Sequence, residues 1–155
     1  MKLYLARHAE PKRREEDPER SLTEKGWSDI RRVAAFLSKH EGIHVKSIIH
    51  SGKARARQTA EVLAEHLKPC NGIKDMKGLK PLDEISVWVD ELGEIEEETM
   101  LVGHLPYLSK LSSYLLCNEE DRGVIDFKSG SVACLERNEH GDWSVQWMVG
   151  PEIVQ

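Results

Sequence analysis

The chain has 155 residues, of which 39% are hydrophobic and 32% are charged, a composition typical of a globular protein and not of a disordered one. Its formal net charge of -5 argues against general binding to nucleic acids or anionic membranes, because both usually require a basic face. No apolar run approaches membrane-spanning length, so we expect no nucleic-acid or membrane partner.

The first quarter of the chain predicts a strand, a loop and a helix. Residues 2–6 (KLYLA) form an apolar run typical of a buried strand, and the polar, proline-containing segment 10–20 is a loop. We expect a helix to begin in SLTEKGW, either at Ser21, which has capping-box spacing to Glu24, or at Thr23. Its apolar stripe recurs at i, i+3, i+4 and i+7, in Ile30, Val33, Ala34 and Leu37.

A second strand and helix follow directly. VKSIIHSG predicts a strand that ends at Ser51 and Gly52, and residues 53–67 are rich in helix formers. Pro69 and Gly72 end this helix. The side that faces the core holds Thr59, Ala60, Leu63, Ala64 and Leu67.

In the next part of the chain a predicted helix comes before a strand. We expect a helix that opens at Asp83 and an acidic loop or helix end at 93–98. Residues 99–104 (TMLVGH) form a continuous apolar run, as in a strand covered on both faces. The helix from Asp83 presents Ile85, Trp88, Val89 and Leu92 on one face, and a further helix runs through Leu108, Leu111 and Leu115.

The C-terminal segment 131–149 reads as an antiparallel hairpin that turns at 139–142, with Trp143, Val145 and Trp147 on one face. Alternating strands and helices with one terminal hairpin predict an α/β fold of three α/β/α layers, with a central, mostly parallel sheet. Neither a repeat nor a linker is evident, so we expect residues 1–155 to form one domain.

Three predicted strands end in groups that can carry positive charge. Arg7 and His8 follow the first strand, Arg55 lies one helical turn after the second, and His104 ends the run 99–104. The carboxyl ends of parallel strands meet at one edge, where α/β sheets bind ligands. Four such groups repel one another in an empty pocket but suit a dianion. Arginine matches phosphoryl oxygens, and the start of the helix after Ser51 adds N–H donors, so we predict a phosphate site.

The same edge supplies a nucleophile. Ser51 has no adjacent base in the sequence, which favours a structural turn or a substrate-binding role for it. A neutral imidazole can attack phosphorus directly and form a phosphohistidine. We therefore expect His8, next to Arg7, to be the nucleophile and His104 to donate a hydrogen bond to the phosphoryl oxygens.

These segments resemble the histidine phosphatase superfamily, also called phosphoglycerate mutase-like. LYLARHAE is similar to the sequence around the family's nucleophile, SGKARARQTAE to its S-x-x-x-R-x-x-Q-T-A element and LVGHLPYLSKL to its second-histidine element. RSLTEKGW and DFKSGSVACLE resemble the small SixA-type phosphohistidine phosphatases in particular. Together these elements cover most of the chain in the expected order.

The resemblance implies a single, cofactor-independent catalytic domain in which His8 is phosphorylated and Arg7, Arg55 and His104 bind the phosphoryl group. Ala9 stands where the family more often has glycine, and its methyl group is small enough to be tolerated. The span between the second and third predicted strands is too short for the helical lid of larger members. We therefore expect an open, shallow site suited to a phosphorylated protein surface.

Asp83 is the candidate general acid, although it is also placed to cap the helix that follows. An alkoxide needs protonation to leave, whereas imidazole, whose protonated form has a pKa of about 6.5, leaves easily. We therefore expect a metal-independent phosphatase that acts on phosphohistidine in a signalling or phosphotransfer protein. The alternatives are a phosphatase for small phosphoesters, such as sugar phosphates or nucleotides, and a non-catalytic phosphate-binding module.

The remaining polar residues give weaker signals. Lys12, Arg13 and Arg14 follow the nucleophile and either widen the positive rim or form a solvated loop. His40, His44 and His50 lack a carboxylate second shell, and no carboxylate cluster suits magnesium, so we expect no metal. Three widely spaced cysteines and the lack of a signal-peptide pattern favour a cytoplasmic protein, which we expect to be a monomer; the cysteines are Cys70, Cys117 and Cys134.

Overall fold

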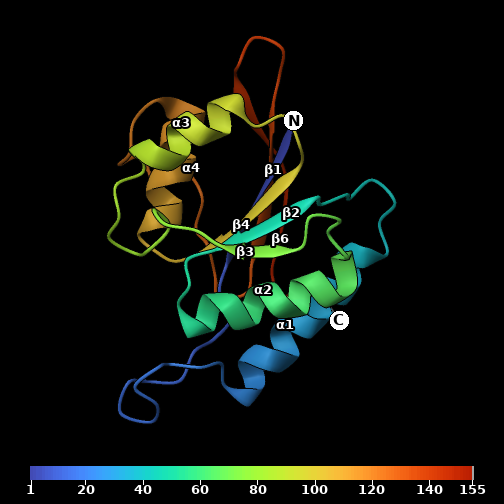
Figure 1. Cartoon of the computed structure of the whole chain (residues 1–155), viewed down its shortest axis with the longest axis vertical. Helices are drawn as coiled ribbons and strands as arrows, with labels where there is room; N and C mark the ends of the chain where they lie inside the picture. Colours follow the sequence, from blue (N-terminus) through green and yellow to red (C-terminus); the bar gives the residue numbers. More distant parts are fainter. Residues whose placement is uncertain (155) are drawn as a thin grey trace.

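The computed structural model describes residues 1–154 and contains a six-stranded mixed sheet with the strand order β3-β2-β4-β1-β5-β6 (Figure 1). The strands β3, β2, β4 and β1 are parallel, whereas β5 is antiparallel to both of its neighbours, β1 and β6. The predicted α/β class, mostly parallel sheet and C-terminal hairpin are confirmed. The strands are β1 (Lys2–Arg7), β2 (Ser47–His50), β3 (Ile73–Asp75), β4 (Thr99–Gly103), β5 (Val132–Arg137) and β6 (Trp143–Val149).

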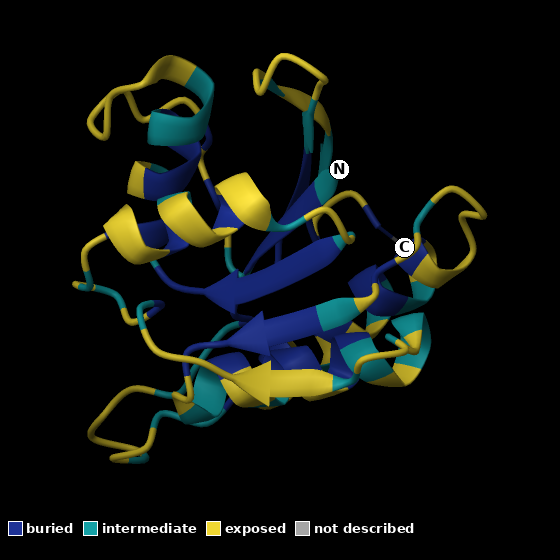
Figure 2. Ribbon diagram, turned by 45° about the horizontal axis from the view of Figure 1, so that its top comes forward, coloured by how far each residue is buried: buried dark blue, intermediate teal, exposed yellow. Residues whose placement is uncertain are grey.

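Helices cover both faces of the sheet, which gives the three predicted layers (Figure 1). The helices are α1 (Glu24–Ser38), α2 (Ala54–Leu67), α3 (Ser86–Glu94) and α4 (Tyr107–Cys117). Because side chains alternate along a strand, Tyr4 and Ala6 of β1 pack with α1 and α2, whereas Leu3 and Leu5 pack with α3 and α4. All five residues of β4 are buried, as expected for its continuous apolar run (Figure 2).

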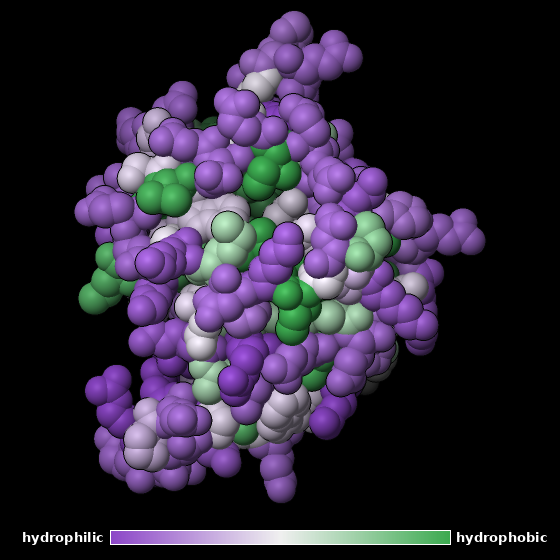
Figure 3. All heavy atoms as spheres, viewed as in Figure 1, coloured by the Kyte–Doolittle hydropathy of each residue, from purple (hydrophilic) through white to green (hydrophobic). Residues whose placement is uncertain are grey.

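The exposed edge strand β3 is absent from the sequence prediction. Its three residues are all exposed, so they carry no apolar pattern that would reveal a strand (Figure 2). The strand exists because β2 offers a free edge, with Ile49 opposite Lys74. Hydrophilic residues cover most of the face seen in Figure 3, and hydrophobic residues appear there only in small groups. Within residues 1–154, no helix has both the length and the apolar character needed to cross a membrane.

Helix α1 begins at the second of its two predicted caps. The Thr23 side chain accepts a hydrogen bond from the Gly26 backbone N–H at 2.9 Å. Ser21 instead donates its hydroxyl hydrogen to the Asp17 carboxylate and so belongs to the preceding loop. The predicted apolar stripe is buried in full, in Ile30, Val33, Ala34 and Leu37.

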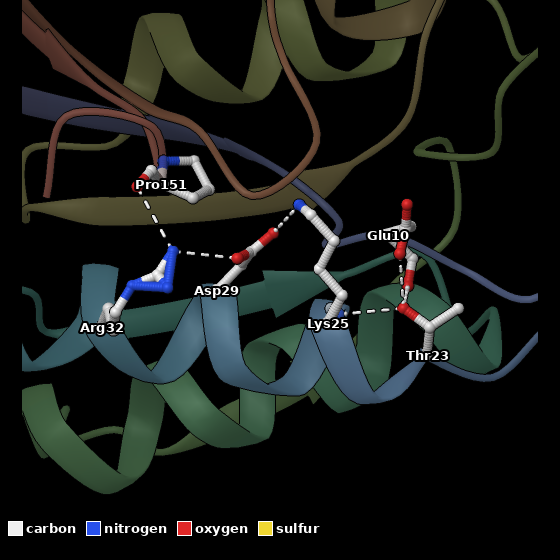
Figure 4. A network of polar contacts seen from close by, with 7 residues as sticks. Glu10, Thr23, Lys25, Asp29, Arg32 and Pro151 are labelled. Carbon is white, nitrogen blue, oxygen red and sulfur yellow. Dashed lines mark hydrogen bonds and ion pairs between the residues drawn. The ribbon is translucent and has the colours of Figure 1, made fainter. Parts of the chain in front are cut away.

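A polar network ties α1 to the C-terminal segment and to the loop after β1 (Figure 4). The Asp29 carboxylate is buried, and it pairs with Lys25 at 2.6 Å and with Arg32 at 2.9 Å. Arg32 also donates to the Pro151 carbonyl at 3.3 Å. Pro151 of the C-terminal segment is thereby held against α1, which also contacts the loop after β1 through Thr23 and Glu10 (Figure 4).

Two sequence predictions are wrong, and both errors have local causes. Helix α3 begins at Ser86 and not at Asp83, because the Asp83 carboxylate accepts the Lys80 backbone N–H at 2.9 Å and closes a turn. Trp143 and Trp147 do not share a face, since a bulge between Cys134 and Leu135 shifts the register of the hairpin by one residue. Trp147 therefore packs on the α1 and α2 side, and Trp143 packs on the α3 and α4 side.

Candidate active site

The carboxyl ends of three parallel strands bring the predicted basic residues together. Arg7 of β1 lies opposite Gly103 of β4, and the His8 backbone N–H donates to the Gly103 carbonyl at 3.0 Å. The rings of His8 and His104 are consequently 5.1 Å apart, centroid to centroid. Directly after the neighbouring strand β2, Ser51 reaches His104, with 2.6 Å between Oγ and Nε2.

His8 is held in the form that a nucleophile needs. Its Nδ1 lies 2.8 Å from the Ala9 carbonyl oxygen, and because a carbonyl can only accept, Nδ1 carries the ring hydrogen. This leaves the lone pair on Nε2. Burial lowers the pKa of His8 to about 4, against a smaller opposite effect of the Ala9 carbonyl, and the charges of Arg55, Arg7 and Arg20 lower it further. The imidazole is therefore neutral at pH 7.

The loop that carries His8 is fixed by hydrogen bonds on two of its sides. The Ala9 N–H donates to Thr59 Oγ1 at 2.9 Å, and this hydroxyl in turn donates to the Arg55 carbonyl at 2.8 Å. On the other side, the Gly130 N–H donates to the carbonyls of Arg7 and His8. Helix α2 and the start of β5 thus place the nucleophile, with Arg55 as part of the same hydrogen-bonded chain.

Close packing at the start of α1 holds the next residue of this loop. A Cβ atom added at Gly26 would lie 2.4 Å from the Glu10 carbonyl oxygen, far inside van der Waals contact. The Glu10 carboxylate also accepts the Thr23 hydroxyl at 2.7 Å (Figure 4). Glycine at position 26 is therefore required for α1 to approach the Glu10 backbone so closely. Glu10 is only two residues from His8 along the chain.

His104 presents a buried donor to the site. Ser51 Oγ accepts the Lys53 backbone N–H at 3.3 Å, so the hydroxyl hydrogen is free to be donated to His104 Nε2. In that arrangement the His104 ring hydrogen is on Nδ1, which is buried and has no partner among the described residues. Burial first, and then the charges of His8 and Arg55, lower the pKa of His104 to about 3 and keep the ring neutral.

Two guanidinium groups complete the edge. Arg7 donates to the Phe127 carbonyl at 2.7 Å, while Arg7 Nε and Arg55 Nε are buried without partners among residues 1–154. Burial lowers the pKa of both arginines, and neighbouring charges oppose this effect at Arg7, through Asp126, but reinforce it at Arg55. These unpartnered donors lie around a neutral imidazole and suit a phosphoryl group, because its oxygens can accept the hydrogen bonds that no protein group accepts.

Arg20 also contributes to the site, although sequence analysis did not single it out. Its charge lowers the pKa of His8, Arg55 and His104, so it faces the same edge. Its backbone adopts a left-handed conformation, with φ of 53°, and its Nε donates to the Lys12 carbonyl at 3.2 Å. The sequence gives no periodic signal for such a loop conformation, which depends on contacts between residues eight positions apart.

The other basic residues of this loop differ in their roles. Arg13 pairs with Glu16 at 2.9 Å in the exposed part of the loop, whereas Arg14 borders a hollow beside Arg55. Arg14 and Arg20 therefore line this hollow, whereas Arg13 belongs to the solvated part of the loop.

Asp83 lies in the turn before α3. The segment that contains it passes the end of β4, since a Cβ added at Gly103 would be 3.8 Å from the Leu79 carbonyl oxygen. The Asp83 charge acts with burial to raise the pKa of Tyr107, in the first turn of α4. Within residues 1–154, Asp83 forms no hydrogen bond or ion pair with His8, Arg7, Arg55 or His104.

The histidines outside the site are engaged elsewhere. His50 Nδ1 accepts the Gly52 backbone N–H at 3.1 Å, and His40 packs edge-on against Phe36, with 4.8 Å between ring centroids. Among the described residues, no group of three or more His, Cys, Asp or Glu side chains is arranged to hold a metal ion.

Two relatives are similar to this chain over most of its length. An uncharacterized protein of Picosynechococcus sp. (strain PCC 7002) is 32% identical over 147 residues, which cover 85% of this chain and 87% of that protein. The phosphohistidine phosphatase SixA of Escherichia coli (strain K12) is 23% identical over 156 residues, which cover 97% of this chain and 94% of SixA.

Solved structures share the fold. The protein histidine phosphatase SixA complexed with tungstate matches with a TM-score of 0.85 at 22% identity, over 97% of both chains. A mycobacterial glucosyl-3-phosphoglycerate phosphatase matches with a TM-score of 0.73 at 16% identity, over 94% of this chain and 96% of the other.

The family model of the histidine phosphatase superfamily (branch 1) matches residues 3–101. This range includes Arg7, His8 and Arg55 and ends just before His104. Because it spans more than half of the 155 residues, the chain belongs to the histidine phosphatase superfamily (branch 1).

Proposed function

We propose that this histidine phosphatase hydrolyses phosphohistidine on a protein, with His8 as the phosphoryl acceptor. His8 Nε2 attacks phosphorus, and the bond from phosphorus to the substrate imidazole breaks. The substrate ring, protonated on its other nitrogen, leaves as neutral imidazole. Water then attacks phosphorus, the bond to His8 breaks, and inorganic phosphate is released while the water proton passes to solvent.

The state of His8 carries this proposal. An imidazole with its hydrogen on Nδ1, a pKa of about 4 and its Nε2 lone pair free is ready to attack at neutral pH. Arg7, Arg55 and the Nδ1 hydrogen of His104 would neutralise the charge that builds up on the phosphoryl oxygens. Ser51 would act by orienting His104 rather than by attacking phosphorus.

The choice of phosphohistidine rests on the leaving group and on similarity. Within residues 1–154, no hydrogen bond or ion pair connects Asp83 to the four basic residues, so none of these contacts holds it at the site as a proton donor for an alkoxide. An imidazole leaving group does not need one. The E. coli relative and the tungstate-bound structure are both SixA, a protein histidine phosphatase, which supports the same substrate class here.

Trapping with an alkaline, denaturing quench tests the mechanism. Wild type incubated with a 32P-labelled phosphohistidine protein should give a labelled enzyme adduct that is stable in base and labile in acid. His8→Ala should give no adduct and no turnover, whereas His140→Ala, which removes a histidine from the exposed hairpin turn, should behave like wild type. A labelled His8→Ala protein would contradict the assignment of the nucleophile. If wild type and His8→Ala were equally inert while both bound phosphate, a binding module would be the better description.

A phosphatase for small phosphoesters is the second candidate, favoured by the Asp83 turn beside the end of β4. A carboxylic acid there could approach an alkoxide leaving group once substrate is bound, and the fold is similar to that of a phosphatase for glucosyl-3-phosphoglycerate. A panel that compares kcat/KM on phosphohistidine protein, sugar phosphates and nucleotides separates the two candidates. Similar values for all three would remove the preference for phosphohistidine.

A further inference from the structure

A cationic hollow lies directly beside the phosphoryl-binding edge. Its volume is about 320 Å³, and it is formed by the loop after β1 and the first turn of α2. Five of its residues are basic and a single one, Glu19, is acidic, in a chain whose net charge is -5. The basic residues are Arg14, Arg20, Lys53, Arg55 and Arg57.

Most of these cations have no carboxylate partner. Arg57 pairs with Glu61 at 3.5 Å, but the other four make no ion pair within residues 1–154. Arg14, Arg20 and Arg55 line the same hollow, and the charges of Arg14 and Arg20 add to the effect of burial in lowering the pKa of Arg55. An excess of positive charge, with five basic residues against one acidic residue in the lining, favours an anionic ligand.

The backbone holds this arrangement in place. The Arg20 N–H donates to the Asp17 carbonyl at 2.9 Å, and Arg20 Nε donates to the Lys12 carbonyl, so the side chain is fixed to its own loop. On the facing wall, Gly52 adopts φ of 88° and lies beside the Asp75 carboxylate, which leaves no room for a side chain there. The hollow is therefore a built feature and not a chance meeting of long side chains.

Arg55 belongs both to the hollow and to the phosphoryl site. A group bound in the hollow is consequently a neighbour of a phosphoryl group bound at Arg55. We propose that the hollow binds an acidic side chain, aspartate or glutamate, that flanks the phosphohistidine of the substrate protein. This inference rests on the proposed function and names the feature by which the site selects among phosphohistidine proteins.

The test compares two phosphohistidine peptides that differ only in flanking glutamates or glutamines. Arg14→Gln together with Arg57→Gln should raise KM for the glutamate peptide about 5- to 10-fold, as expected for the loss of one or two exposed charge pairs, with kcat unchanged. The same variant should hydrolyse the glutamine peptide and an aryl phosphate within about twofold of wild type. Arg31→Gln is the control, because it removes one positive charge outside the hollow, from α1, where Arg31 stacks on Trp27. Equal losses on both peptides, or no loss on either, would overturn the proposal.

A second measurement tests whether the hollow binds an acidic side chain, independently of whether the substrate is phosphohistidine. Unphosphorylated glutamate peptide should inhibit aryl phosphate hydrolysis by wild type and by Arg31→Gln to the same extent. It should inhibit hydrolysis by the double variant about 5-fold less strongly. If no phosphohistidine peptide is turned over but this pattern of inhibition persists, the substrate proposal fails and the acidic-ligand site stands. If a small bisphosphate inhibits selectively and the glutamate peptide does not, the hollow binds a second phosphate and the acidic side chain is the wrong ligand.

Discussion

The nucleophile should keep its reactive form far into the acid range. At pH 5, an imidazole with a pKa of about 4 is about 90% neutral, whereas one with the ordinary pKa of about 6.5 is about 3% neutral. Burial is the main cause of the lowered pKa, and the nearby arginines add to it. The expected difference in reactive enzyme at this pH is therefore about 30-fold.

Nuclear magnetic resonance measures this directly. The ring carbon and proton shifts of His8, assigned by comparison with His8→Ala, should titrate with a midpoint near pH 4 in phosphate-free buffer, with free imidazole in the tube as the reference. Arg55→Gln should raise the midpoint only part of the way to 6.5, because burial remains. A midpoint above pH 6 in the wild-type protein would refute the reasoning that burial keeps His8 neutral.

The lowered pKa of His8 also makes the free energy of unfolding depend on pH. Between about pH 6.5 and 4, the unfolded chain binds a proton at His8 that the folded protein does not, so the free energy of unfolding falls as the solution is acidified. The contribution of His8 to this fall is about 3 kcal/mol at most. Urea unfolding across this range should therefore show a shallower pH dependence for His8→Ala than for wild type.

Three further predictions concern the residues that hold or assist the nucleophile. Gly26→Ala places a Cβ 2.4 Å from the Glu10 carbonyl oxygen, so we expect a loss of about 1–3 kcal/mol in urea unfolding and a lower kcat on aryl phosphate; unchanged values of both would contradict the packing argument. Thr59→Val leaves the buried Ala9 N–H without an acceptor, which should cost about 1–3 kcal/mol and lower kcat, and Thr59→Ser should restore both if the hydroxyl is the cause. Asp83→Asn should reduce kcat/KM for phosphoesters much more than for phosphohistidine, and equal reductions would remove the leaving-group argument.

The sequence predicts the meeting of Arg7, His8, Arg55 and His104 because it depends on regular features. Apolar runs identify β1, β2 and β4, the connections through helices imply parallel strands, and parallel strands place their carboxyl ends at one edge. The predicted stripe of α1 and the burial of β4 follow from the same periodic patterns. Such features need no knowledge of distant contacts.

The parts that sequence analysis missed depend on contacts that no local pattern records. Arg20 reaches the site through a left-handed residue and a bond to the Lys12 carbonyl, and Asp83 closes a turn with Lys80 instead of capping α3. The bulge that moves Trp147 to the opposite face from Trp143 is set by pairing between β5 and β6. In each case hydrogen bonds between particular residues set the conformation, and no periodic pattern of apolar residues records them.

The antiparallel course of β5 and β6 decides where the protein tolerates attachments. The turn at 138–142 lies a strand length, about 20 Å, from the start of β5 beside His8, and in Figure 1 it stands at the far end from the loop after β1. A fluorescent label or an affinity tag there, or at Met1 next to it, should leave catalysis intact. A fusion at the C-terminus is different, because Pro151 packs against Gly130 next to the nucleophile and Val154 is buried. Immobilisation for binding assays should therefore use the hairpin turn or the N-terminus.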